Sequence, residues 1–372
     1  MHRVVVLVAI FLAWLSPATG PRSAAAGGPD LSRLVRQGTA LAGHDRTAAL
    51  SYFRRHGLHP ELGLDGRTIT VRVGGREIAI LPSSVTTQPL RRHGLSSRLR
   101  RQDTPTSRRA IVLEPFATEL DLGSNAGVPE VQALQSLGYT VTALRDSAVS
   151  LATMATLAQY SVVYMETHSG VLSSGDAVVA TAQTDTTGLD ALFHDGSVIQ
   201  VTVAGDPTKK LYIGITGKYV TQHLNAFPTR SLVYLNGCAV LAAPLFWSAL
   251  QARGVSTLVS WDHDAIDSTE DEAARLVFED LAAGNTVVTA VNAARANGLG
   301  TSFVDGTQAR LGFLGAGSLT LAAPAVLPAD TPTATPTATS VARTTHRRHR
   351  PPCTHRRKTR CRRHTKKRHK GG

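Results

Sequence analysis

The chain has 372 residues, which is enough for one large domain with appendages or for two domains. Apolar residues make up 42% of the chain and charged residues 18%, and this composition excludes a wholly disordered protein. There are only three cysteines, and two of them lie near the C-terminus, which excludes a disulfide-dense scaffold and a four-cysteine zinc site.

The first 26 residues are typical of a secretory signal peptide. A basic start is followed by an apolar run at 4–15 and then by small residues at 23–27. The run is shorter than the roughly 20 apolar residues that a membrane-spanning helix needs. The sequence therefore predicts an exported protein without a transmembrane span, either secreted or associated with the cell surface. The alternative is an uncleaved N-terminal anchor.

Residues 27–90 predict a small α+β unit. The stretch 31–56 has the apolar pattern of a helix, and residues 67–81 alternate in polarity around Gly74 and Gly75, which indicates a β-hairpin. An Arg-rich linker follows at 91–109. We interpret the unit as an inhibitory pro-region that is released by self-cleavage in this linker, after Arg101 or Arg109. A permanent accessory domain on a flexible tether is the competing hypothesis.

Residues 110–323 predict one α/β domain. We expect a mainly parallel, doubly wound sheet, because strands and helices alternate along the chain. The expected strands are 110–113, 139–144, 161–165, 178–181, 197–203, 210–215, 231–235, 256–261 and 313–321. The expected helices are 128–137, 150–159, 241–253, 268–283 and 287–296, of which 268–283 would begin with a Ser268/Asp271 capping pattern.

The C-terminal part holds most of the positive charge. Residues 324–342 form a Thr/Pro repeat that is typical of an extended stalk. Residues 343–372 contain 14 Lys and Arg, five His and no acid, so that removing their charge from the net +13 leaves the rest of the chain at −1. Such a tail stays disordered and solvated, and its charge predicts non-specific binding to a polyanion such as a cell-wall polymer, nucleic acid or anionic lipid.

A histidine and the one cysteine outside the tail follow two of the expected core strands. His168 comes after the strand at 161–165, and Cys238 after the strand at 231–235. Ligands of open α/β sheets bind beyond the carboxyl ends of the strands, so both residues are expected at the same edge. A Cys–His pair is the minimum for thiolate catalysis. Glu166 would face the same way as His168 in an extended chain and could orient the imidazole; the alternative is a solvated carboxylate.

The order of these motifs resembles the caspase–haemoglobinase fold of cysteine peptidases, and within it the clostripain/gingipain and CHAT-domain group. The likeness covers roughly residues 110–322. It rests on the stretches SLVYLNGCA at 231–239, FWSALQARGVSTLVSW at 246–261, DEAA at 271–274, LAAGNTVVTAVNAAR at 281–295 and FLGAGSLTL at 313–321. Two departures stand out: Ser169 separates His168 from Gly170, and Gly-Ala-Gly stands where relatives often carry Gly-Asp-Pro.

The resemblance implies specific roles for the motif residues. Cys238 would be the nucleophile and His168 the general base or acid. The N–H groups of Cys238 and of Gly170 or Ser169 would form the oxyanion hole. No cofactor and no metal ion are implied, and the substrate would be a protein or peptide.

The segment after the strand at 256–261 would line the substrate pocket by the same resemblance. It offers an aromatic wall from Trp261 and carboxylates from Asp262, Asp264 and Asp267, which suit a guanidinium or ammonium group. We rank Asp262 first among them. The alternatives are a helix N-cap and turn cluster, or a calcium site without EF-hand spacing.

Together these features favour an exported cysteine endopeptidase that cuts after basic residues and is tethered by its tail. The alternative is a non-catalytic caspase-like module that acts in adhesion or binding. A Rossmann-type nucleotide enzyme is disfavoured, because Glu114, Pro115 and Phe116 stand where a Gly-rich loop would follow the first strand.

Overall fold

The computed structural model describes residues 31–83, 104–118, 127–206, 208 and 210–322. The expected signal peptide, most of the linker with Arg101, the stalk and the basic tail lie outside the described residues. All of the described residues belong to one compact unit that ends at Pro324. No helix within these ranges is long and apolar enough to cross a membrane.

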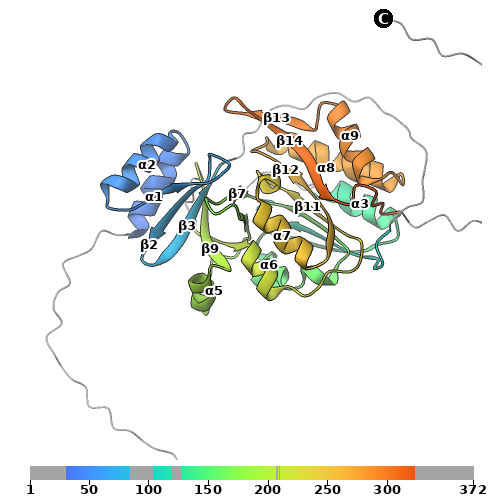
Figure 1. Cartoon of the computed structure of the whole chain (residues 1–372), viewed down its shortest axis with the longest axis horizontal. Coiled ribbons are helices and arrows are strands. Elements are labelled where there is room, and N and C mark those ends of the chain that lie inside the picture. Colours follow the sequence, from blue (N-terminus) through green and yellow to red (C-terminus); the bar gives the residue numbers. More distant parts are fainter. Residues whose placement is uncertain (1–30, 84–103, 119–126, 207, 209, 323–372) are drawn as a thin grey trace, which may run out of the picture. The chain divides into compact units, whose positions relative to one another are not determined.

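A mostly parallel sheet of seven strands forms the centre of this unit (Figure 1). Its order is β13-β14-β12-β11-β6-β4-β5, and the pairings from β12 to β5 are all parallel. The strands are β4 (Arg109–Glu114), β5 (Thr140–Arg145), β6 (Val162–Glu166), β11 (Ser231–Asn236), β12 (Val255–Trp261), β13 (Thr301–Val304) and β14 (Thr307–Gly315). The fold is therefore mixed α/β around a mostly parallel sheet, as the alternation of strands and helices predicts.

A second seven-stranded sheet has the order β1-β2-β3-β9-β10-β8-β7. Its strands are β1 (Glu61–Leu62), β2 (Ile69–Val73), β3 (Arg76–Leu81), β7 (Ser169–Val171), β8 (Ala177–Ala180), β9 (Val198–Val203) and β10 (Tyr212–Thr216). Only the β3–β9 pairing is parallel. The expectation of one sheet was wrong, because the excursion after β6 pairs with itself and with the N-terminal hairpin.

Apolar layers cover both faces of the central sheet. Val162 and Tyr164 of β6 pack on one side with α3 (Val128–Ser136), α8 (Asp267–Ala282) and α9 (Val287–Ala296). Val163 and Met165, which alternate with them, pack on the other side. That side is covered by the second sheet together with α4 (Leu151–Met154), α6 (Gly217–His223) and α7 (Pro244–Ala252), while α5 (Asp190–Asp195) precedes β9. This two-sided burial explains why β4, β6 and β11 are apolar runs.

The N-terminal unit joins the second sheet through its hairpin. α1 (Leu31–Ala42) and α2 (Arg46–Arg55) pack on β2 and β3 (Figure 1). β3 continues the sheet by pairing with β9 from Ile78 to Leu81. The expected helix at 31–56 is two helices, because Asp45 caps α2 by accepting a hydrogen bond from the amide of Ala48 at 2.9 Å. The predicted hairpin is confirmed.

Four further boundaries differ from the sequence expectations. The helix expected at 150–159 is α4 followed by a 3-10 turn, Leu157–Gln159, and the helix at 241–253 begins only at Pro244, after a 3-10 turn, Val240–Ala242. The capping pattern at 268 was wrong, since α8 begins after Ile266 without a side-chain cap. The strand expected at 313–321 ends at Gly315 and starts at Thr307, where it forms a hairpin with β13.

The contact between α1 and α2 gives a stability prediction. A Cβ atom on Gly38 would lie 1.9 Å from the ring of Phe53, which is fully buried. We expect Gly38→Ala to lower the free energy of unfolding by about 1–3 kcal/mol, because a packed core resists added volume. Urea denaturation measures it, and Gly38→Ala combined with Phe53→Leu should recover part of the loss. A Gly38→Ala chain as stable as the wild type would contradict this packing.

Candidate functional site

Parallel pairing brings the predicted Cys and His segments together. β6 and β11 are adjacent, and the last residue of each, Glu166 and Asn236, stand opposite one another. His168 and Cys238 each follow two residues later, at the same edge of the sheet. The hydroxyl of Ser169 donates a hydrogen bond to the carbonyl oxygen of Cys238 at 2.8 Å, which ties the two segments directly. The expectation of neighbouring strands is confirmed.

Cys238 is a buried thiol in a constrained turn. It is 5% exposed, and the amide of Ala265 donates a hydrogen bond to its sulfur. Burial raises the pKa of the thiol well above its usual value, and the carboxylate of Asp264 raises it further. The next residue, Ala239, has a left-handed backbone with φ 62°, a conformation that costs about 1 kcal/mol for a residue with a Cβ. The chain thus accepts strain to turn directly after the cysteine.

His168 is a buried, neutral imidazole. It is 6% exposed, and its ring packs on Phe116 with centroids 4.9 Å apart. Burial lowers the pKa of His168 to about 4, while the negative charge of Asp206 raises it in part. The imidazole is therefore neutral at pH 7, and the same burial makes it a weaker base than an exposed histidine. Asp206 is a site residue that the sequence reasoning missed, because the loop that carries it is distant in sequence from His168.

Glu166 belongs to a different group of residues than the one expected. It interacts with Asp271 and Glu270, and Glu130 interacts with the same Asp271; we call these four residues the carboxyl cluster. The carboxyl of Glu166 shares a hydrogen bond with Asp271, and the hydroxyl of Tyr164 donates to it at 3.4 Å. Burial raises the pKa of Glu166 well above its usual value, which favours its protonated form. Its expected role as a partner of His168 stays a prediction, and Asp206 is the acid whose charge acts on that histidine.

The residues expected to form the oxyanion hole lie against the N-terminal unit. Ser169 and Gly170 begin β7, and both are buried. A Cβ atom on Gly170 would lie 2.1 Å from the hydroxyl oxygen of Thr68, so the two segments approach more closely than a side chain would permit. Close packing against Thr68 therefore requires glycine at position 170. This requirement is separate from the catalytic role that the resemblance implies for Gly170.

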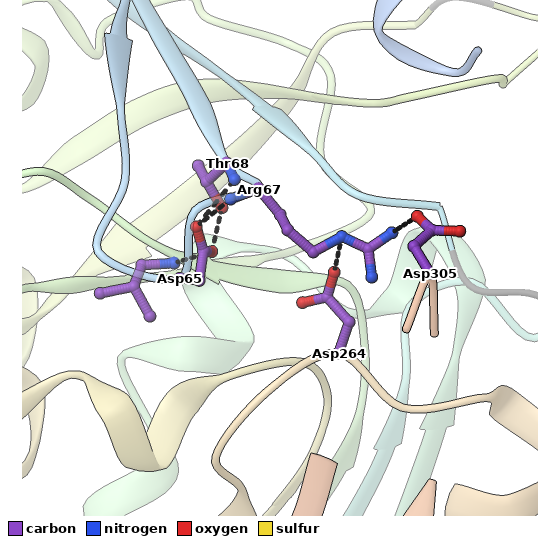
Figure 2. A network of polar contacts seen from close by, with 6 residues as sticks. Asp65, Arg67, Thr68, Asp264 and Asp305 are labelled. Atoms are coloured by element: carbon purple, nitrogen blue, oxygen red, sulfur yellow. Dashed lines mark hydrogen bonds and ion pairs between the residues drawn. The ribbon is translucent and has the colours of Figure 1, made fainter. Parts of the chain in front are cut away.

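The expected pocket residues separate into four environments. Trp261 is fully buried in the core beneath α8, so its ring forms part of the core packing. The Asp262 side chain is 37% exposed and accepts a hydrogen bond from the amide of Arg310 at 2.6 Å. Asp267 is the first residue of α8 and is half-buried. Asp264 is only 2% exposed, and its carboxylate lies 2.7 Å from Nε of Arg67 (Figure 2).

A cavity of about 700 Å³ lies next to His168. Phe116 lines this cavity and also packs on the imidazole, and Tyr212 lines it with its ring 5.0 Å from that of Phe116. Lys210 and Asp146 supply charged groups to the same wall. Within the described ranges, no three His, Cys, Asp or Glu side chains are arranged to hold a metal ion.

No family model matches the chain, and no curated protein matches it.

The carboxyl cluster gives a prediction about pH. Burial raises the pKa of Glu130 to about 7 from 4.5. The folded chain therefore binds this proton more tightly than the unfolded chain does, so the contribution of Glu130 to stability is most favourable below about pH 4.5 and is lost as the pH rises to about 7. Glu130→Gln removes the titration, and its stability relative to the wild type should rise by up to about 3 kcal/mol between pH 4.5 and 8.

Urea denaturation at several pH values measures this difference. Asp190→Asn, which removes a carboxylate that is 85% exposed, controls for the loss of a negative charge. A Glu130→Gln effect that stays constant over this range would show that Glu130 does not hold a proton in the folded protein.

Proposed function

We propose that the chain is an exported cysteine endopeptidase of the caspase-like type, in which Cys238 attacks the substrate and His168 accepts the thiol proton. The observation that carries the proposal is the position of the two residues, each two residues beyond the end of adjacent parallel strands. The resemblance to clostripain, gingipains and CHAT domains supports it, because the same order of motifs is found there. The expected signal peptide supports export.

In the proposed peptide hydrolysis, Cys238 acts as the nucleophile and His168 transfers the proton. The imidazole of His168 takes the proton of the Cys238 thiol, a transfer that becomes more favourable when opening of the site exposes both groups to water, because burial lowers the pKa of His168 and raises that of Cys238. The thiolate attacks the scissile carbonyl carbon, and backbone N–H groups of Cys238 and of Ser169 or Gly170 stabilise the oxyanion. The protonated imidazole then gives its proton to the leaving amine, and water hydrolyses the thioester.

Asp264 is the residue that we propose to bind a basic substrate side chain. The sequence favoured Asp262, but the carboxylate of Asp264 is buried beside the thiol, and Arg67 already provides it with a guanidinium partner. A buried carboxylate gains far more from a cation than an exposed one does. The same pocket would therefore accept the side chain of Arg or Lys before the scissile bond.

A non-catalytic binding module is the second candidate function. It is favoured by the burial of both Cys238 and His168, at 5% and 6% exposure, because a working nucleophile must meet its substrate. In that case the basic tail would supply binding to a polyanion, and the Cys–His pair would serve packing alone.

The first test is hydrolysis of peptides by purified variants. Cys238→Ala should abolish cleavage, a loss of about 10³-fold or more, since the nucleophile is removed. His168→Ala should do the same, whereas Cys353→Ser in the tail should leave cleavage unchanged. Circular dichroism checks that each variant is folded. Equal hydrolysis by the wild type and Cys238→Ala would refute the proposed mechanism.

The second test is specificity. Asp264→Asn should reduce kcat/KM for peptides with Arg before the scissile bond by about 30-fold or more, because loss of one partner of a desolvated ion pair costs 2–5 kcal/mol. Hydrolysis of peptides with a neutral residue there should change much less. Asp262→Asn is the matched control, because that carboxylate is partly exposed. If Asp262→Asn instead loses activity selectively on peptides with Arg, then Asp262 binds the basic side chain, as the sequence analysis predicts.

A further inference from the structure

Residues 63–68, which connect β1 to β2, lie across the candidate site. They form a turn in which the carboxylate of Asp65 accepts hydrogen bonds from the amides of Arg67 and Thr68, both at 2.8 Å. The same carboxylate accepts a hydrogen bond from the amide of Val171 at 2.9 Å. Val171 belongs to β7 and stands three residues after His168, so the turn is attached directly to the segment that carries the imidazole.

Close packing extends this contact on both sides of Asp65. Thr68 lies against Gly170, where an added Cβ would be 2.1 Å from its hydroxyl oxygen. An added Cβ on Gly63 would lie 1.8 Å from the carbonyl oxygen of Val171. The turn therefore packs against the backbone of Gly170, one of the residues expected to bind the oxyanion, and against that of Val171.

Arg67 reaches from this turn to the proposed specificity residue. Its Nε lies 2.7 Å from the carboxylate of Asp264, and its Nη2 lies 2.6 Å from that of Asp305 (Figure 2). The pair with Asp264 is desolvated, because the side chains are 12% and 2% exposed, whereas Asp305 is 64% exposed. Loss of Arg67 would therefore leave a buried carboxylate without its partner, which costs more than the loss of an exposed pair.

The buried pair adjoins the thiol. Asp264 precedes Ala265, whose amide donates to the sulfur of Cys238. The guanidinium of Arg67 thus pairs with a carboxylate whose neighbour in the chain contacts the nucleophile, which is where we propose that a basic substrate side chain binds. The hairpin that holds the turn is itself fixed, since β3 pairs with β9 and its inner face packs with α1 and α2.

We propose that residues 63–68 act as a built-in inhibitor, in which Arg67 takes the place of the substrate's basic side chain on Asp264 and the turn thereby limits access to Cys238. This inference rests on the proposed endopeptidase function for its biological meaning. It goes beyond that function, because it attributes the inactive state of the enzyme to the turn at 63–68 and to the ion pair between Arg67 and Asp264. Activation then requires that this turn leave the site.

The test measures access to Cys238 and needs no catalysis. The full chain, with Cys353→Ser and Cys361→Ser, is treated with iodoacetamide, and the labelling rate of Cys238 is followed by mass spectrometry. Arg67→Ala should raise the rate by about tenfold or more, which corresponds to about 1.4 kcal/mol of lost occlusion. Arg67→Lys keeps the charge and should stay close to the wild type.

Arg76→Ala is the matched control on the same hairpin. Arg76 forms an ion pair with the exposed Asp190 at 2.7 Å, so its loss should leave the labelling rate unchanged. Labelling of folded Arg67→Ala at the wild-type rate would overturn the proposal, as would an equal increase in Arg76→Ala. If Arg67→Ala does not fold, Arg67→Gln, which keeps most of the side chain's bulk, is read in the same way.

Peptide hydrolysis by the same variants separates the two proposals. Faster hydrolysis by Arg67→Ala than by the wild type supports both. If Cys238 is labelled faster in Arg67→Ala than in the wild type but no variant hydrolyses peptides, the turn does limit access to the thiol and the endopeptidase function is refuted. Full hydrolysis by the wild type that Arg67→Ala does not increase retains the endopeptidase and refutes the inhibitory turn.

Discussion

The in-register parallel pairing of β6 with β11 is the constraint on which the candidate site depends. It places Glu166 opposite Asn236, and thereby gives His168 and Cys238 equivalent positions beyond one sheet edge. Both strands can be continuous apolar runs because helices cover one face and the second sheet covers the other. The positions of the residues that follow them are thus set by the paired strands of the core, which is what the proposed catalytic pair requires.

The titratable groups at this edge of the central sheet are also shielded from water. This desolvation keeps the His168 imidazole neutral and the Cys238 thiol protonated, since burial disfavours each charged form. It also makes an unpaired carboxylate at Asp264 costly, and the chain meets that cost with Arg67. The same low polarity that would strengthen binding of a basic substrate therefore also strengthens the internal contact that excludes it.

The sequence predicted the central strands well, because apolar runs such as β4, β6 and β11 are buried on both faces and leave little ambiguity. It also predicted the neighbouring positions of His168 and Cys238, which follow from parallel pairing. It did not predict the second sheet, since the pairing of β3 with β9 joins segments more than a hundred residues apart. For the same reason Arg67 and Asp206 were missed, because no local pattern indicates which distant residues a turn or loop will contact.

The central claim is that Arg67 occupies the position of a substrate side chain. A crystal structure of Cys238→Ala with a bound peptide that carries Arg before the scissile bond tests it most directly. The account predicts that the peptide's guanidinium pairs with Asp264 and that Arg67 has left this carboxylate, with the turn at 63–68 displaced from β7. A peptide bound elsewhere, with the contact between Arg67 and Asp264 intact, would contradict the account.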